Sequence, residues 1–159
     1  MKNIDLAYMA GMFDGEGCIC IGKAKVKNNR KGIRFALYLS LGMANKYIPE
    51  LFYLTFGGRI LKIPPHSTDL VKNAFKTQWT WRIDAQKAIL CLKVLLPYLR
   101  LKRNEAELAI KFQGRKSVHG GVKGIQGHPL KTDEEWAVEE AQYILMRNLK
   151  DKSEVTVNG

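Results

Sequence analysis

A strict alternation of apolar and polar side chains over residues 33–43 constrains the fold of this chain more than any other feature. A two-residue period is typical of a strand that has one face on a core and the other in solvent. The apolar set on one face is Phe35, Leu37, Leu39, Leu41 and Met43. The other face carries Arg34, Tyr38 and Ser40. The pattern therefore predicts a long strand with one apolar and one basic or polar face.

The preceding segment, residues 18–27, predicts a partner strand with one irregularity. Ile19 and Ile21 share a face, but Ala24 and Val26 continue the apolar set only if one residue is skipped. A β-bulge at residues 22–23 would supply the skip. It would also turn three basic side chains to the polar face: Lys23, Lys25 and Lys27. With the NNRKG segment as its turn, this unit is expected to be a long hairpin.

A second hairpin and several helices are expected around this one. Residues 5–13 are helix-like, and Asn45 can cap a helix over residues 46–55 that ends at Gly57 and Gly58. Residues 59–63 and 77–83 then form the second hairpin, in which Trp79 and Trp81 fall at strand period and are expected in the core.

Helices complete the chain after the second hairpin. One is expected from Asp84 through residue 96, halted by Pro97, and another over residues 101–112. Residues 116–131 form a glycine-rich loop, and the capping-box pair Thr132 and Glu135 opens a last helix to about residue 149. The resulting α+β order is helix, two strands, helix, two strands, then helices. We expect one domain, with a core over residues 1–115 and residues 132–159 belonging to it.

The charge distribution indicates a polyanionic partner. Basic residues number 26 against 15 acidic ones, for a formal net charge of +11. Residues 18–82 hold 12 basic residues and two acidic ones, whereas residues 128–159 hold 4 basic and 7 acidic residues. A basic sheet that binds nucleic acid is the first candidate, and a merely cationic soluble surface is the alternative.

The cysteines and the apolar runs predict a soluble intracellular protein. Cys18, Cys20 and Cys91 form no even-numbered disulfide framework, and the first ten residues lack the pattern of a secretory signal. The longest apolar run is broken by Lys93 and is too short for a membrane span. We expect the protein in the cytoplasm or nucleoid, or in an organelle, without a membrane partner.

The most informative string for chemistry is LAYMAGMFDGEGC at residues 6–18. Glycine inside a helix costs about 1 kcal/mol relative to alanine, so Gly11 suggests close approach of another backbone. Asp14 and Glu16 then fall at the end of the helix, where a carboxylate could hold a hard cation beside a scissile phosphate. Taken by itself, DGEG is also compatible with a surface turn.

Residues 9–17, MAGMFDGEG, resemble the LAGLIDADG motif of the homing endonucleases with conservative substitutions. The αββαββ order fits the core of that family. TFGG at residues 55–58 is similar to its turn before the third strand, and PYLRLK at residues 97–102 is similar to its later proline-to-lysine segment. The resemblance covers about residues 5–113. It implies a four-stranded antiparallel saddle sheet with helices on one face and further helices at the carboxyl end.

The resemblance also implies the site residues. Glu16 matches the metal-binding carboxylate of the family, with Gly15 beside it in the metal site, and Lys102 matches the basic residue near the scissile phosphate. Asp14 matches the earlier acidic position, which shapes the helix end. Asn45 is our choice for the polar residue near the end of the second strand, and helix capping is the equal alternative.

The motif occurs once, so the resemblance implies a homodimer that meets through the small-residue face of the first helix, which includes Ala7, Gly11, Asp14 and Gly15. The activity implied is magnesium-dependent cleavage of both strands of a long, near-palindromic DNA site, leaving short 3′ overhangs. The expected DNA-binding residues are Lys23, Lys25, Lys27, Arg30, Arg34, Tyr38, Ser40, Arg59, Gln78, Thr80 and Arg82.

Other functions explain less of the sequence. An intron RNA maturase or a non-cleaving DNA-binding protein on the same scaffold would need neither Glu16 nor Lys102, and a structural RNA-binding protein would leave DGEG unexplained. RNA therefore stays a less favoured partner than double-stranded DNA. His119 and His128 lie in the glycine-rich loop without a cysteine or acidic residue at metal-ligand spacing, so we expect them to be solvated.

Overall fold

The computed structural model describes residues 3–27, 31–65, 76–118 and 132–152. Its elements follow the predicted order, which confirms the α+β assignment. They are α1 (Asn3–Glu16), β1 (Gly17–Lys25), β2 (Ile33–Met43), α2 (Tyr47–Phe56), β3 (Arg59–Ile63), β4 (Gln78–Asp84), α3 (Ala85–Leu95), α4 (Arg103–Val118) and α5 (Asp133–Lys152). No helix among the described residues is both long and apolar enough to cross a membrane.

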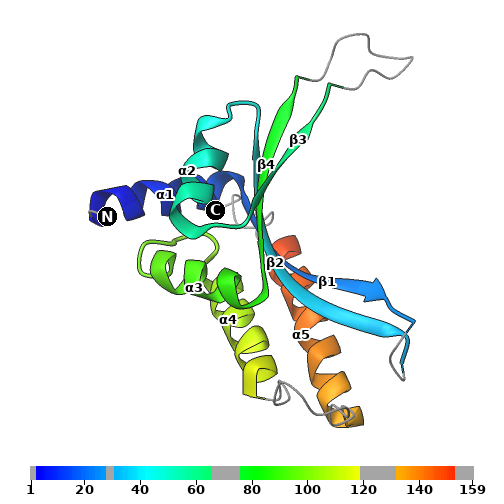
Figure 1. Cartoon of the computed structure of the whole chain (residues 1–159). Coiled ribbons are helices and arrows are strands. Elements are labelled where there is room, and N and C mark those ends of the chain that lie inside the picture. Colours follow the sequence, from blue (N-terminus) through cyan, green and yellow to red (C-terminus); the bar gives the residue numbers. More distant parts are fainter. Residues whose placement is uncertain (1–2, 28–30, 66–75, 119–131, 153–159) are drawn as a thin grey trace.

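The strands form one antiparallel sheet in the order β1-β2-β4-β3. β1 and β3 are therefore the edge strands. Figure 1 shows the two hairpins diverging from the centre of the sheet, while α1 to α4 lie together on one side of it. The sheet thus has a helix-covered face and a face that these four helices leave open. The prediction of a four-stranded sheet with helices on one face is confirmed.

The alternation in β2 works as predicted. Four of its apolar residues on the helix side are almost fully buried and Met43 is partly buried, whereas the polar residues between them are partly or fully exposed. Across the sheet, Trp81 in β4 pairs with Leu41 and is fully buried. The Trp81 ring packs on Phe52 of α2 with ring centroids 5.0 Å apart, and Phe52 in turn stacks on Phe13 of α1 at 6.0 Å. Aromatic packing therefore fastens α1 and α2 to the centre of the sheet.

The predicted bulge in β1 is wrong. Pairing runs without interruption from Gly17 opposite Leu41 to Lys25 opposite Ile33. Because residues at every second position share a face, Lys23 lies on the same side as its buried partner Phe35. Ala24, one of the two apolar residues that suggested the bulge, pairs with Arg34 on the open face of the sheet and is exposed.

The turn between α2 and β3 requires glycine. Gly58 has φ 96°, a conformation that side chains with a Cβ rarely adopt, and a Cβ there would lie 2.4 Å from the carbonyl oxygen of Arg82. Gly57, also at positive φ, accepts a 2.8 Å hydrogen bond from the indole N–H of Trp81 at its carbonyl oxygen. The predicted helix end at these two glycines is confirmed.

The carboxyl-terminal helix α5 packs on α4 and on the first hairpin. Its predicted capping box is confirmed, because the backbone N–H of Thr132 donates to the Glu135 carboxylate and the Glu135 N–H donates to the Thr132 hydroxyl. Lys31 lies 3.0 Å from Asp133. Acidic side chains of α5 thus pair with basic side chains of the hairpin.

Candidate functional site

The buried carboxylate of Asp14 organises the end of α1. One of its oxygens accepts hydrogen bonds from the backbone N–H groups of Arg100 at 2.7 Å and Leu101 at 3.2 Å. The other accepts from the N–H of Lys102 at 3.0 Å. These N–H groups precede α4, so Asp14 satisfies donors at the start of another helix. The prediction that Asp14 shapes the helix end agrees with this geometry.

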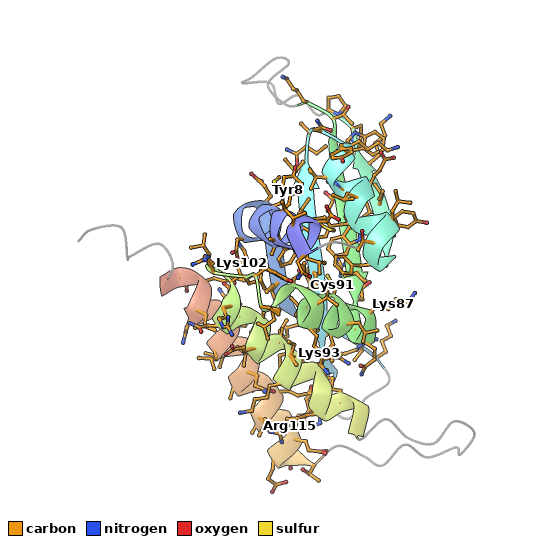
Figure 2. All side chains as sticks on the ribbon, turned by 90° about the vertical axis from the view of Figure 1, so that its left-hand side faces the viewer. Tyr8, Lys87, Cys91, Lys93, Lys102 and Arg115 are labelled. Carbon is orange, nitrogen blue, oxygen red and sulfur yellow. The ribbon has the colours of Figure 1, made fainter. Side chains whose placement is uncertain are left out.

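Lys102 lies at the same end of α1. Its ammonium group donates a hydrogen bond to the backbone carbonyl oxygen of Asp14. Carbonyl groups in the last turn of a helix carry a partial negative charge, which favours a cation there. Figure 2 shows Lys102 next to α1, on the side of the molecule that also displays Tyr8. The fold therefore brings residues 14 and 102 into contact although 88 positions separate them.

Glu16 is the last residue of α1 and is exposed. Among the described residues no hydrogen-bond or ion-pair partner is recorded for its carboxylate. Asp14, two residues earlier, is 8% exposed and has three donors. The two acidic residues of the motif therefore have different environments. The Asp14 carboxylate binds backbone N–H groups of its own chain, whereas the Glu16 carboxylate is exposed and available to a ligand.

The outer side of α1 is left uncovered at its glycines by the described residues of the chain. A Cβ built on Gly11 or Gly15 would find nothing within 4 Å. Ala7 is exposed beside them, and so are two larger apolar side chains of the helix, Ile4 at 74% and Tyr8 at 51%. A hollow borders this side, lined by Ala7, Gly11, Asp14 and residues 97–100. The small-residue stripe is thus an open surface of the single chain.

The open face of the sheet carries most of the predicted nucleic-acid-binding residues. Strand pairing places on it Arg34, Tyr38, Ser40, Arg59, Gln78, Thr80 and Arg82. Arg82 lies 3.9 Å from the centre of the Tyr38 ring, and Asp84 binds Arg82 and Arg59, each at 3.1 Å. Asp84 therefore orders two arginines here. It also precedes α3 as predicted, but its side chain makes no capping hydrogen bond.

The basic residues of β1 do not join this face. Lys23 and Lys25 lie on the helix side by strand register, so the prediction that they face outward with the polar set is wrong. The uninterrupted register of β1 places them there, and on that side Glu140 of α5 binds the Lys23 ammonium at 3.0 Å, while the centre of the Phe35 ring lies 5.6 Å from it. Lys27 is exposed beyond the end of β1, and Arg30 lies outside the described residues.

Solved structures place this arrangement in a known fold. I-CvuI, a homing endonuclease crystallised with the I-CreI target in the presence of Mg, has a TM-score of 0.59 and 17% identity over 98% of this chain and 83% of its own. The archaeal intron-encoded homing endonuclease I-Vdi141I, complexed with DNA, has a TM-score of 0.56 and 13% identity over 94% and 99% of the two chains. This chain has the LAGLIDADG homing-endonuclease fold. The resemblance found in the sequence is thereby confirmed.

The fold also occurs in a longer neighbour. The LAGLIDADG homing endonuclease I-GzeII, in complex with a DNA target, has a TM-score of 0.55 and 15% identity over 89% of this chain but only 43% of its own. No protein-family model and no curated protein sequence matches this chain. The structural likeness therefore carries the assignment of the LAGLIDADG fold.

The donors at the end of α1 fit a hard cation only in part. Carboxylate and carbonyl oxygens are suitable ligands, and Glu16 with the Gly15 carbonyl supplies both types. No cluster of three His, Cys, Asp or Glu side chains that could hold a metal occurs in residues 3–27, 31–65, 76–118 and 132–152. A cation here would therefore need further oxygen ligands from outside this chain.

Asn45 is used at a helix start. Its side-chain oxygen accepts a 2.9 Å hydrogen bond from the backbone N–H of Tyr47, the first residue of α2. This contact supports the helix-capping interpretation that the sequence left open. No described contact joins Asn45 to Glu16 or Lys102, and its catalytic role stays a prediction.

Sequence reasoning missed Glu105, which is buried beneath the site in α4. Burial raises the pKa of its carboxyl group, while the nearby cations Lys102 and Lys150 act in the opposite direction. Among the described residues, one carboxylate oxygen of Glu105 is buried without a hydrogen-bond partner. No local pattern distinguishes this glutamate from its exposed neighbour Glu107, because only packing against the other elements buries it.

A thiol cluster on β1 was also missed. The sulfur atoms of Cys18 and Cys20 are 3.2 Å apart, and the Lys150 ammonium of α5 lies 3.1 and 3.2 Å from them. The hydrogen bond from Cys18, with help from Tyr38 and Lys150, lowers the pKa of Cys20 to about 5 despite partial burial. Burial alone would lower the pKa of Lys150, but its contacts with the sulfur atoms raise it. The two-residue spacing of the cysteines was visible in the sequence. Nothing in the sequence indicated that Lys150 lies beside them.

Proposed function

We propose that this chain is a site-specific DNA endonuclease that acts as a homodimer. The observation that carries the proposal is the exposed carboxylate of Glu16, which has no partner among the described residues, at the end of a helix with an open small-residue side in a LAGLIDADG fold. A protein that only bound nucleic acid would not need this carboxylate or the ammonium of Lys102 at the same end of α1. The neighbours described above are complexes with DNA, which supports DNA as the substrate.

The proposed DNA-binding surface is the open face of the sheet. The major groove of B-DNA admits a two-stranded ribbon and presents a distinct pattern of donors and acceptors at each base pair. Arg34 is exposed on this face, and Arg82 is held by both Asp84 and the Tyr38 ring. An arginine ordered in advance loses less side-chain freedom when it binds a base or a phosphate.

We propose Mg²⁺ as the cofactor, held by the Glu16 carboxylate and the Gly15 carbonyl. When bound, a divalent cation supplies an activated water and stabilises negative charge on the leaving oxygen. The remaining ligands would be phosphate oxygens of the DNA and groups of the second subunit.

The residues of the chain have separate tasks in this proposal. Lys102 holds a positive charge at the end of α1, where it would stabilise the negative charge that develops at the scissile phosphate. Asp14 is a positioning residue, because its contact with the N–H of Lys102 holds the backbone of that lysine against α1. Glu16, which is exposed, would bind the cation.

The second subunit would pack on the outer side of α1. Ala7, Gly11 and Gly15 present almost no side chain, so two copies of the helix can approach closely and bring one Glu16 from each to the centre. A chain that covers 99% of I-Vdi141I but 43% of I-GzeII holds one unit of the fold in this view. Two sites related by a two-fold axis would cut both strands and leave short 3′ overhangs.

The decisive experiment is a cleavage selection with purified protein and Mg²⁺ on a randomised DNA library. We expect one long, near-palindromic site to be cut in both strands. Glu16→Gln should abolish cleavage and leave affinity for the selected site within a few-fold, because it removes a metal ligand and no phosphate contact. Glu134→Gln, at an exposed glutamate of α5, is the matched control and should cut at the wild-type rate. Cleavage by Glu16→Gln at that rate would refute the assignment, and binding without cleavage by the wild type would favour a pure binding protein.

The proposed surface is tested with two basic residues of one hairpin. Arg34→Ala, on the open face, should weaken DNA binding. If the side chain reads a base, the loss should be about 1–3 kcal/mol at that base; if it contacts a phosphate, all sequences should bind more weakly and the slope of log affinity against log salt concentration should fall by about one unit. Lys23→Ala, on the helix face, is the control and should bind like the wild type. The reverse result would place the DNA on the other side of the sheet.

A further inference from the structure

The thiol cluster of Cys18, Cys20 and Lys150 has no task in the function proposed above. Both cysteines are partly exposed, and they lie on the open face of β1, an edge strand. Cys20 pairs with Tyr38 across the sheet, and Cys18 pairs with Ser40. Cys91, the remaining cysteine, is fully buried in α3. The cluster thus differs from an ordinary core cysteine in both exposure and charge.

Two features of the cluster favour reaction with an electrophile. The Lys150 ammonium, about 3 Å from both sulfur atoms, stabilises a thiolate, which is the reactive form of cysteine. The second sulfur is already in contact with the first, at 3.2 Å. The same ammonium opposes binding of a soft metal cation, because it places a positive charge where the metal would lie. The electrostatics therefore favour oxidation over metal binding.

We propose that Cys18 and Cys20 form a reversible oxidation site that reacts with hydroperoxides. The Cys20 thiolate attacks one oxygen of hydrogen peroxide, the O–O bond breaks, and hydroxide leaves, giving a sulfenic acid. The hydroxide takes up the proton that the Cys20 thiol released and becomes the first water. The sulfur of Cys18 then attacks the sulfenic sulfur, and its proton leaves with the hydroxyl group as water. The balance is two thiols and one peroxide to one disulfide and two waters.

Strand geometry makes this disulfide a strained one. Residues two apart in a strand have Cα atoms roughly 6.6 Å apart, close to the upper limit of about 6.8 Å for disulfides. Bond formation should therefore bend β1 between its cysteines, at Ile19. An edge strand can bend more easily because only β2 pairs with it. Strained disulfides have more oxidising potentials, so cellular thiols should reduce this one readily.

The oxidation site is tested on the full chain without DNA or metal. After timed exposure to hydrogen peroxide at neutral pH, remaining thiols are alkylated and located by peptide mass spectrometry. We expect the peptide with Cys18 and Cys20 to lose two hydrogens at least about tenfold faster than free cysteine reacts, because the Lys150 ammonium in contact with both sulfur atoms stabilises the thiolate. Dithiothreitol should reverse the change, and Cys91 should stay reduced. A rate no greater than that of free cysteine would overturn the proposal.

Variants separate the roles of the three residues. Cys18→Ser should stop the reaction at the Cys20 sulfenic acid, which dimedone traps. Lys150→Gln should slow oxidation about tenfold, since it removes the charge that stabilises the thiolate. Lys111→Gln, at an exposed lysine of α4, is the matched control and should react like the wild type. Equal rates in Lys150→Gln and the wild type would overturn the proposed role of the ammonium.

A final arm of the experiment rests on the proposed function. Because both thiols lie on the face proposed to bind DNA, a saturating amount of the selected duplex should slow their oxidation. Fast oxidation that DNA does not slow would contradict the DNA surface and leave the thiol site intact. Slow oxidation without DNA would contradict the thiol site and leave the DNA surface intact.

Discussion

The two sides of α1 have different environments: one packs against the rest of the chain and the other is exposed. The inner side consists of Met9, Ala10, Phe13 and Asp14, all buried against the rest of the chain. The outer side carries Ala7, Gly11 and Gly15, which are exposed, and a Cβ on either glycine would contact nothing. One helix therefore contributes to the stability of the single chain on one side and offers a bare surface on the other. Substitutions on the two sides should accordingly separate folding from assembly.

The largest effect is expected on the inner side. Phe13→Ala removes a fully buried ring that stacks on Phe52, and truncations of this kind typically cost about 3–5 kcal/mol. Urea unfolding at a concentration where the chain is monomeric measures the loss. Tyr8→Ala, on the exposed outer side of the same helix, should change the monomer by no more than about 0.5 kcal/mol. Comparable losses for the two variants would remove the distinction between the sides.

The next effect concerns the inner carboxylate. Asp14→Ala leaves three backbone N–H groups at residues 100–102 without their acceptor, and a partly buried unsatisfied donor costs about 1–3 kcal/mol. We expect a loss of about 3 kcal/mol in the free energy of unfolding, because water replaces part of the lost bonding. Amide hydrogen exchange at residues 100–102 should rise in parallel. An unchanged exchange rate there would show that these groups do not depend on Asp14.

A smaller and more specific effect is expected on the outer side. Gly11→Leu should leave the monomer as stable as before or up to about 1 kcal/mol more stable, because leucine favours a helix more than glycine does. It should weaken the proposed dimer by at least about 1–3 kcal/mol through overpacking. Sedimentation over a range of concentrations measures the dimer. Gly114→Leu is the matched control, since Gly114 is also helical and a Cβ there would find nothing within 4 Å. A fully dimeric Gly11→Leu protein would place the interface on another surface.

The smallest effect is a pH dependence beneath the site. Burial raises the pKa of Glu105 in the folded chain, so the folded state retains a proton that the unfolded state releases. The protonated Glu105 carboxyl contributes fully to the free energy of unfolding below the ordinary pKa of glutamate. This contribution is lost as the pH rises through the higher pKa that Glu105 has in the folded chain. Glu105→Gln should therefore gain stability relative to the wild type as pH increases across that interval. Parallel urea titrations of both proteins at several pH values test this, and a constant difference would contradict it.

Local patterns accounted for most of the fold. The alternation over residues 33–43, the Thr132 and Glu135 capping box and the glycines at residues 57–58 each act through residues near one another in the chain. Their predictions are confirmed because the governing contacts are local. The bulge in β1 was wrong for a related reason. The apolar residues Ala24 and Val26 were assumed to mark the core side of β1, but the strand register places Ala24 opposite Arg34 on the open face.

The sequence by itself determined the order of the elements, the two faces of β2 and the placement of Glu16 at the end of a helix. Only the tertiary structure decided which distant groups the side chains of these elements contact. It assigned Asp14 to the N–H groups of residues 100–102, turned Lys23 toward Glu140, and brought Lys150 to the cysteines. Those partners are at least 86 residues apart in the chain. Such pairs depend on how helices pack on the sheet, and no short-range period in the sequence records that packing.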